Sequence, residues 1–195
     1  MGTLSFVTSP LWLPDGETVE VRPVCDGVDI LGQIDRDAIG LYPPDFFAQS
    51  ALSSGGMLRL GICQCGSKGC ADREVEVTHQ DGDIYWWSRH TEVLKKWRFD
   101  IETYKRAVSL ASDDLSWERT EDTIKRLLKV EDYSAVLKQG WQFEGGYLMD
   151  DGSGVNLCFN VANGAPQTIA ITCPTYEPEL AIAAVRAYMD KHFAN

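Results

Sequence analysis

Residues 74–88 read Glu-Val-Glu-Val-Thr-His-Gln-Asp-Gly-Asp-Ile-Tyr-Trp-Trp-Ser, and this stretch predicts an antiparallel β-hairpin. The dipeptide Asp81-Gly82 separates two runs rich in β-branched and aromatic residues, which is typical of a two-residue hairpin turn. Such a turn pairs Gln80 with Asp83 and His79 with Ile84. Because a hairpin needs further strands to be stable, the stretch indicates a larger antiparallel sheet around it.

The same register assigns the side chains of the hairpin to two faces. Val75, Val77 and Trp86 fall on one face, which we expect to be the core face. Tyr85 and Trp87 fall on the other face. Since large aromatic side chains are usually buried to a high degree, we expect these two residues to pack under helices formed elsewhere in the chain.

The segment directly before the hairpin, Gly61–Cys70, reads Gly-Ile-Cys-Gln-Cys-Gly-Ser-Lys-Gly-Cys and holds three of the six cysteines. Three thiolates supply three of the four ligands of a tetrahedral zinc site. His90 returns on the second hairpin strand to the end where Cys70 lies, whereas His79 is about 30 Å away at roughly 3.3 Å per residue. We therefore predict zinc bound by Cys63, Cys65, Cys70 and His90.

Other interpretations of the cysteine segment stay open. The fourth ligand can instead be Asp72, a distant cysteine or water. Without metal, the three thiols can be reduced and buried, as free cysteines often are. A third alternative is a Cys65–Cys70 disulfide or a redox-active thiol, whose pKa the nearby cations Lys68 and Arg73 can lower.

The cysteine segment and the residues after it resemble a group of uncharacterised bacterial proteins. These proteins share a G-x-C-x-C-G-x-x-G-C loop, a hairpin ending in Trp87-Ser88, and a helix start like Trp97-Arg-Phe-Asp-Ile-Glu-Thr-Tyr104. Ser116-Trp117-Glu118 and the helix after it fit the same pattern, so the resemblance covers about residues 57–128. It implies a bacterial, cytoplasmic protein and brings no activity with it.

Length and composition are those of an ordinary globular protein. The chain has 195 residues, of which 44% are hydrophobic and 24% charged, and its net charge is −11. We expect one domain, 1–195, which can contain two lobes, 1–98 with the cysteine segment and 99–195. The negative charge disfavours binding to nucleic acid.

Acidic residues are concentrated in the first third of the chain. Residues 1–56 contain eight of them against two arginines: Asp15, Glu17, Glu20, Asp26, Asp29, Asp35, Asp37 and Asp45, with Arg22 and Arg36. A solvated surface that aids solubility explains this pattern. The functional alternative is an acidic face that binds a basic protein partner.

Several features indicate a cytoplasmic protein. No apolar run approaches the roughly 20 residues of a transmembrane helix. Met1–Pro14 lacks the basic start and apolar centre of a signal peptide. In a reducing cytoplasm, metal-bound or free thiols are favoured over disulfides.

The periodicity of the remaining chain predicts an α+β fold. The N-terminal region is largely antiparallel β structure, followed by central helices and a C-terminal three-stranded meander with a closing helix. Pro43-Pro44 disfavours regular structure, and the segment to Gly56 is expected to form a loop that can contain one turn around Phe46–Leu52. Predicted strands are Val19–Val24, Met57–Ile62, Gln142–Leu148, Val155–Val161 and Thr168–Cys173. Asp100 can cap a helix that runs to about Ala111. Further helices are predicted from Thr120, from Tyr133 to Gln139, and from Pro178 to about Phe193.

No catalytic motif stands in the context that its chemistry requires, and we name no catalytic residue. The sequence favours a non-catalytic binding or regulatory module with a structural zinc at the cysteine segment. A protein that neutralises a bacterial toxin is one version of this hypothesis. The alternatives are a metal-dependent hydrolase with an open zinc position and a thiol redox protein. The oligomeric state does not follow from the sequence.

Overall fold

The structure is a computed structural model that describes residues 1–13, 16–64, 72–88, 94–162 and 164–193. The chain divides into two compact units, Met1–Trp117 (unit 1) and Glu118–Asn195 (unit 2). Both combine antiparallel sheets with helices, so the predicted α+β class is confirmed. Unit 1 includes the first long helix, which the sequence analysis placed in the second lobe.

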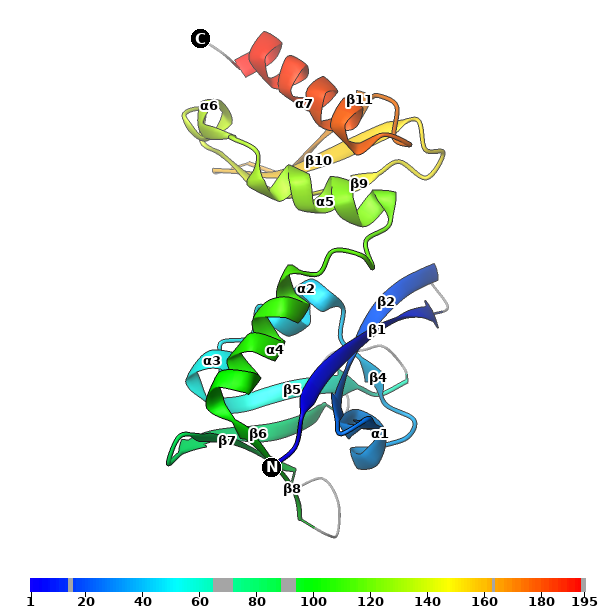
Figure 1. Ribbon diagram of the computed structural model, residues 1–195. Coiled ribbons are helices and arrows are strands. Elements are labelled where there is room, and N and C mark those ends of the chain that lie inside the picture. The colour runs from blue at the N-terminus through cyan, green and yellow to red at the C-terminus, as the bar shows by residue number, and fades with distance from the viewer. Residues whose placement is uncertain (14–15, 65–71, 89–93, 163, 194–195) are drawn as a thin grey trace. The chain divides into compact units, whose positions relative to one another are not determined.

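Unit 1 contains two sheets (Figure 1). The first has the strand order β1-β2-β3, and the second has the order β4-β5-β6-β7-β8. The strands are β1 (Leu4–Leu13), β2 (Gly16–Cys25), β3 (Val28–Asp29), β4 (Ile39–Gly40), β5 (Gly56–Ile62), β6 (Arg73–Gln80), β7 (Asp83–Ser88) and β8 (Lys95–Asp100). The helices are α1 (Ile30–Ile34), α2 (Pro43–Phe47), α3 (Ala51–Ser54) and α4 (Ile101–Asp113).

The hairpin that anchors the larger sheet forms as predicted. Gln80 pairs with Asp83 and His79 with Ile84. Asp81 and Gly82 both have positive φ values, 52° and 83°, which is the backbone geometry of a type I′ turn. The turn therefore determines the register and, with it, which side chains of β6 and β7 face the core.

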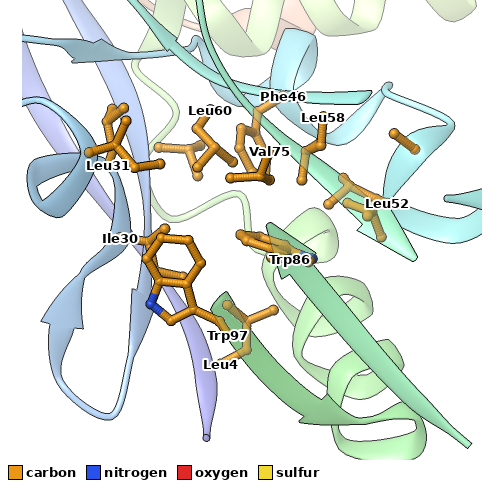
Figure 2. Packing of buried hydrophobic residues seen from close by; sticks show 14 of the residues in the cluster. Leu4, Ile30, Leu31, Phe46, Leu52, Leu58, Leu60, Val75, Trp86 and Trp97 are labelled. Atoms are coloured by element: carbon orange, nitrogen blue, oxygen red, sulfur yellow. The ribbon is translucent and has the colours of Figure 1, made fainter. Parts of the chain in front are cut away.

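The core of unit 1 lies against one face of the five-stranded sheet (Figure 2). Strands β5, β6 and β7 contribute Leu58, Leu60, Val75 and Trp86 to it, and all four are fully buried. Short helices supply further large apolar side chains to the same cluster, among them Leu31, Phe46 and Leu52. The predicted core face of the hairpin is thus correct.

Two predictions for unit 1 differ from the structure. The expected loop after Tyr42 instead contains helices α2 and α3. A proline at the first helical position is compatible with a helix, because that N–H has no helical partner in any case, and Pro43 and Pro44 open α2 in this way. The second difference is β8, a strand that was not predicted and whose alternating Trp97 and Phe99 face the core.

Helix α4 begins and packs as its sequence predicts. The Asp100 carboxylate accepts a hydrogen bond from the Thr103 backbone N–H at 2.9 Å. This backbone contact is the main cause that lowers the pKa of Asp100, and the Thr103 side chain adds to it. Among the residues of α4, Tyr104 is the one that is buried. Its ring meets the Trp86 ring edge-on and the Phe99 ring at a tilt.

Unit 2 is a three-stranded antiparallel meander with helices on one face. Its elements are α5 (Thr120–Val130), α6 (Ser134–Leu137), β9 (Trp141–Leu148), β10 (Gly154–Val161), β11 (Gln167–Thr172) and α7 (Pro178–Phe193). Alternate β10 residues Val155, Leu157 and Phe159 are completely buried. The predicted meander and closing helix are confirmed.

Unit 2 contains two free cysteines, Cys158 and Cys173. Cys173 is buried in the core of unit 2, and burial raises the pKa of its thiol. Cys158 faces the other side of the meander beside Thr168. No helix in the described ranges combines the length and the apolar character that crossing a membrane requires.

Candidate functional site

Cys63 is the member of the predicted zinc ligand set that falls within the described residues. It directly follows strand β5, is half-buried, and is disulfide-bonded. A sulfur in a disulfide is not a thiolate ligand. The other predicted ligands, Cys65, Cys70 and His90, lie outside the described residues, as does the Cys65–Cys70 pair, so the zinc site stays a prediction.

The described residues also do not form a metal site elsewhere in the chain. Across the part of the chain that the structure describes, no three His, Cys, Asp or Glu side chains form a group that could hold a metal ion. His79 lies at the exposed turn end of β6, away from Arg73 at the other end of the strand. Its exclusion as a ligand of the cysteine segment stays an expectation.

Two ion pairs hold the chain next to the cysteine segment. Asp72, the alternative fourth ligand, pairs with Arg59 of β5 at 2.6 Å. Arg73 pairs with Asp35 at 2.6 Å, just after α1. The backbone N–H of Asp37 and the Arg73 guanidinium lower the pKa of Asp35. The start of β6 is therefore tied both to the neighbouring strand and to the end of α1.

The side of the larger sheet opposite the core carries a cluster of aromatic and cationic side chains. We define this outer-face cluster as Tyr85, Trp87, Lys96, Arg98 and Thr78. The Lys96 Nζ atom lies 4.1 Å from the centroids of both the Tyr85 and the Trp87 rings. Each such cation–π contact contributes about 0.5–1 kcal/mol at an exposed site.

Within the described residues of unit 1, Tyr85 and Trp87 do not pack under a helix, contrary to the expectation from the sequence. Both are half-buried, and they alternate along β7 with the core residues Ile84 and Trp86. The helices of unit 1 pack on the core face, so the partner of these two rings is Lys96 from β8 rather than a helix. The reason is the strand β8, which pairs Trp87 with Lys96 and Tyr85 with Arg98.

Further contacts orient the outer-face cluster. The Trp87 Nε1–H donates to the Thr78 hydroxyl at 3.2 Å. Arg98 donates through Nε to the Asp83 carboxylate at 2.6 Å, and this interaction raises the pKa of Arg98. The Asp83 side chain is nearly buried, whereas that of Arg98 is 51% exposed. Asp83 therefore holds the Arg98 guanidinium in place, while about half of the Arg98 side chain stays accessible to solvent.

A shallow groove of about 560 Å³ lies beside Trp87. Its lining residues are Glu76, Thr78, His79, Gln80, Trp87 and Leu94. The groove gives the outer-face cluster an indole wall and hydrogen-bonding side chains next to it. This chemistry suits recognition of a surface that presents both apolar and polar groups.

The sequence contained a signal for this cluster. Lys95–Asp100 alternates between outward cations and inward aromatics, Lys96 and Arg98 against Trp97 and Phe99. That period of two indicates a strand. Without β8 as a neighbour of β7, the hairpin alone cannot place Lys96 on the rings.

Several of the N-terminal acidic residues have partners within unit 1. The Glu20 carboxylate is nearly buried and accepts from the Gly40 backbone N–H at 2.5 Å. Arg22 bridges Glu20 and Asp29 at 3.2 and 2.7 Å. Asp35 is bound by Arg73 in the same way. These acidic residues therefore contribute to the stability of the fold, which accounts for some of the acidic residues without a basic protein partner.

No family model, no curated protein and no solved structure matches the chain. The resemblance to bacterial proteins over about residues 57–128 therefore stays a prediction.

Proposed function

We propose that this chain is a non-catalytic binding module that contacts a protein partner through the outer-face cluster. The observation that carries the proposal is the position of Lys96 over both Tyr85 and Trp87 on the side of the sheet opposite the core. Aromatic and cationic side chains are enriched where proteins bind each other. The described residues of unit 1 leave this cluster partly exposed, so it supplies such side chains in fixed positions.

The partner presents acidic side chains beside an apolar group. Among the described residues, no carboxylate lies within ion-pair distance of the Lys96 ammonium, and the Arg98 side chain keeps half of its surface exposed. A carboxylate of the partner can therefore pair with Lys96, whereas Arg98 already pairs with Asp83 and offers only the exposed part of its guanidinium. The Trp87 ring and the groove beside it accommodate an apolar side chain at the same time.

The test is affinity purification from the source cells with the full chain as bait. We expect Trp87→Ala to lower recovery of the specific partner about tenfold, because an aromatic anchor contributes about 1.4 kcal/mol or more. Lys96→Glu should have a similar effect through charge reversal. Tyr147→Ala is the matched control, since Tyr147 lies on the exposed face of the unit 2 meander.

The outcome is decided by quantitative mass spectrometry and by the folded state of each variant. Equal recovery of the same proteins with Trp87→Ala and with Tyr147→Ala would contradict the proposal. So would the absence of any protein retained specifically by the unmodified chain.

A second candidate, a thiol redox protein, is favoured by the disulfide bond of Cys63. Reduction by a dithiol would convert that bond into two thiols, while the dithiol becomes a disulfide. Thiol titration of the native and reduced protein, with elemental analysis of the same samples, separates this candidate from the zinc hypothesis. About one zinc per chain that disappears in Cys63→Ser supports zinc. A metal-free protein that gains two thiols on mild reduction supports redox chemistry.

A further inference from the structure

A second groove, of about 690 Å³, lies between strand β1 and helix α4 in unit 1. We call it the β1–α4 groove, and its main lining residues are Leu4, Phe6, Thr103, Ala107, Leu110 and Asp114. The two walls start close together, because the Gly2 backbone N–H donates to the Arg98 carbonyl at 2.8 Å and α4 follows directly after β8. Figure 1 shows β1 and α4 extending from this common end.

Strand β1 is an edge strand, and its outward backbone groups follow from the register. The Val21 N–H donates to the Leu41 carbonyl, which lies on the side of β2 away from β1. Val21 is paired across the strands with Thr8, and this pair is therefore a non-hydrogen-bonded one. In such a pair the backbone groups of both residues point outward, so the N–H and C=O of Thr8 point away from β2.

The same alternation applies along the rest of β1. Leu4 and Phe6 share the parity of Thr8, so their N–H and C=O groups also point to the open edge. Within the described residues, β1 pairs only with β2. Pro10 has the same parity but lacks an N–H, which ends the series of outward donors. The outward backbone groups of Leu4, Phe6 and Thr8 thus point to this edge, and of these residues Leu4 is buried as a whole with its side chain in the core.

The helical wall of the groove is apolar where it faces this edge. Leu110 is 67% exposed, although it lies on the helix that contributes Tyr104 to the core. Ala107 and Ala111 leave room beside it. The 13 residues of α4 span about 20 Å, which is the length of roughly six residues of extended chain.

The charged residues of the groove are distributed along its length. Asp100 and Asp114 line the groove from the two ends of α4, and Arg106 lies between them. Both carboxylates also accept backbone hydrogen bonds, from Thr103 and Ser116, which lower their pKa values. They are therefore negatively charged over the neutral pH range and favour basic residues at both ends of a bound segment.

We propose that the β1–α4 groove binds an extended peptide segment of a partner protein by adding it as a strand to the free edge of β1. The peptide backbone bonds to Leu4, Phe6 and Thr8, and alternate apolar side chains contact Leu110 and the neighbouring alanines. Strand addition fits this surface because the outward backbone groups of Leu4 and Phe6 line the same groove as the apolar residues of α4, and Thr8 continues the open edge beyond it. The proposal does not depend on the outer-face cluster.

The first test selects phage-displayed random peptides of about eight residues on the full chain. We expect enriched peptides to alternate apolar and polar residues and to carry Lys or Arg near their ends. Hydrogen exchange of the complex with a synthetic selected peptide should slow the amides of Leu4, Phe6 and Thr8 about tenfold. Absence of enrichment, or protection confined to the outer-face cluster, would overturn the proposal.

Variants on each wall test the mode of binding. Leu110→Arg should weaken the selected peptide about tenfold, while Leu137→Arg, at an exposed leucine of unit 2, should leave binding unchanged. Thr8→Pro removes one outward donor and should weaken binding more than Thr8→Ala does. Equal binding by the two arginine variants would contradict the proposal, as would concentration-dependent self-association that competes with the peptide, since β1 would then pair with a second copy of the chain.

Discussion

The two units have related architectures but differ in their open sheet faces. In each unit helices cover one face of an antiparallel sheet. The other face carries Tyr85, Trp87 and Lys96 in unit 1. In unit 2 the corresponding face carries Asn156, Cys158 and Asn160 from β10 and the exposed Tyr147 from β9, and the described residues there form no cation–π pair. Because aromatic side chains beside cations are enriched at binding surfaces, this difference agrees with the proposal that unit 1 carries the binding surface.

The cores of the two units differ as well. Unit 1 is centred on Trp86, which meets Phe99 and Tyr104 with interplanar angles of 77° and 81°. In unit 2 the closest ring pair is Tyr133 stacked on Phe143, with centroids 4.2 Å apart. Each unit thus has its own aromatic cluster, and the comparison predicts that each unit unfolds separately.

The largest effects are expected from truncating the aromatic centre of each core. Trp86→Ala should destabilise unit 1, and Phe159→Ala unit 2, each by about 3–5 kcal/mol, because both side chains are fully buried. Hydrogen exchange with mass spectrometry should show loss of protection in the mutated unit alone. Trp86→Phe should have a smaller effect. Simultaneous unfolding of both units by one substitution would show that they form one cooperative unit.

A smaller effect is expected at the start of helix α5. Asp122 is 3% exposed and accepts hydrogen bonds from the Arg119 backbone N–H and side chain at 3.2 and 3.0 Å. Asp122→Ala should lower the stability of unit 2 by about 1–2 kcal/mol, whereas Glu121→Ala should change it little. Asp100→Ala, at the exposed cap of α4, should lower the stability of unit 1 by less. Urea unfolding of each variant measures the difference, and an equal effect of Asp122→Ala and Glu121→Ala would contradict the role of the cap.

The smallest effect at neutral pH is expected from the buried tyrosines. Neither the Tyr104 nor the Tyr133 hydroxyl has a hydrogen-bond partner among the described residues, so replacing either by Phe should change stability by less than about 1 kcal/mol. Burial raises the pKa of Tyr104 to about 12 and raises that of Tyr133 as well.

These shifts predict a difference at alkaline pH. The folded state holds the Tyr104 proton more tightly than the unfolded state, whose pKa is about 10. Stability is therefore retained below pH 10 and falls as the pH rises from about 10 toward about 12. Tyr104→Phe should reduce this loss in unit 1, and Tyr133→Phe in unit 2. Tyr176→Phe, at a side chain that is 74% exposed, should leave it unchanged in both.

Much of the fold followed from local patterns in the sequence. The Asp81-Gly82 turn, the Asp100 cap and the period-two strands of the meander are all confirmed. Each depends on residues close together in the chain, so local backbone preferences and side-chain alternation suffice. Pro43-Pro44 was misassigned because the same dipeptide can end regular structure or begin a helix, and packing of Phe46 into the core decided between the two.

The candidate sites followed from the sequence only in part. Cys63, Cys65, Cys70 and His90 were selected by spacing, and of these the structure describes Cys63, in a disulfide. The outer-face cluster was not predicted, because it needs Lys96 from a strand that begins seven residues after β7 ends. Contacts between separate strands depend on pairing that no single local pattern encodes.

The sequence by itself determined the fold class, the register of the central hairpin and the approximate positions of the long helices, since periodicity and turn chemistry act over a few residues. Only the tertiary structure decided which strand lies beside β7, which edge of β1 stays open, and which faces the helices cover. These choices depend on long-range packing, which brings together residues such as Gly2 and Arg98 that are distant in the chain. Both proposed binding surfaces arise from that packing.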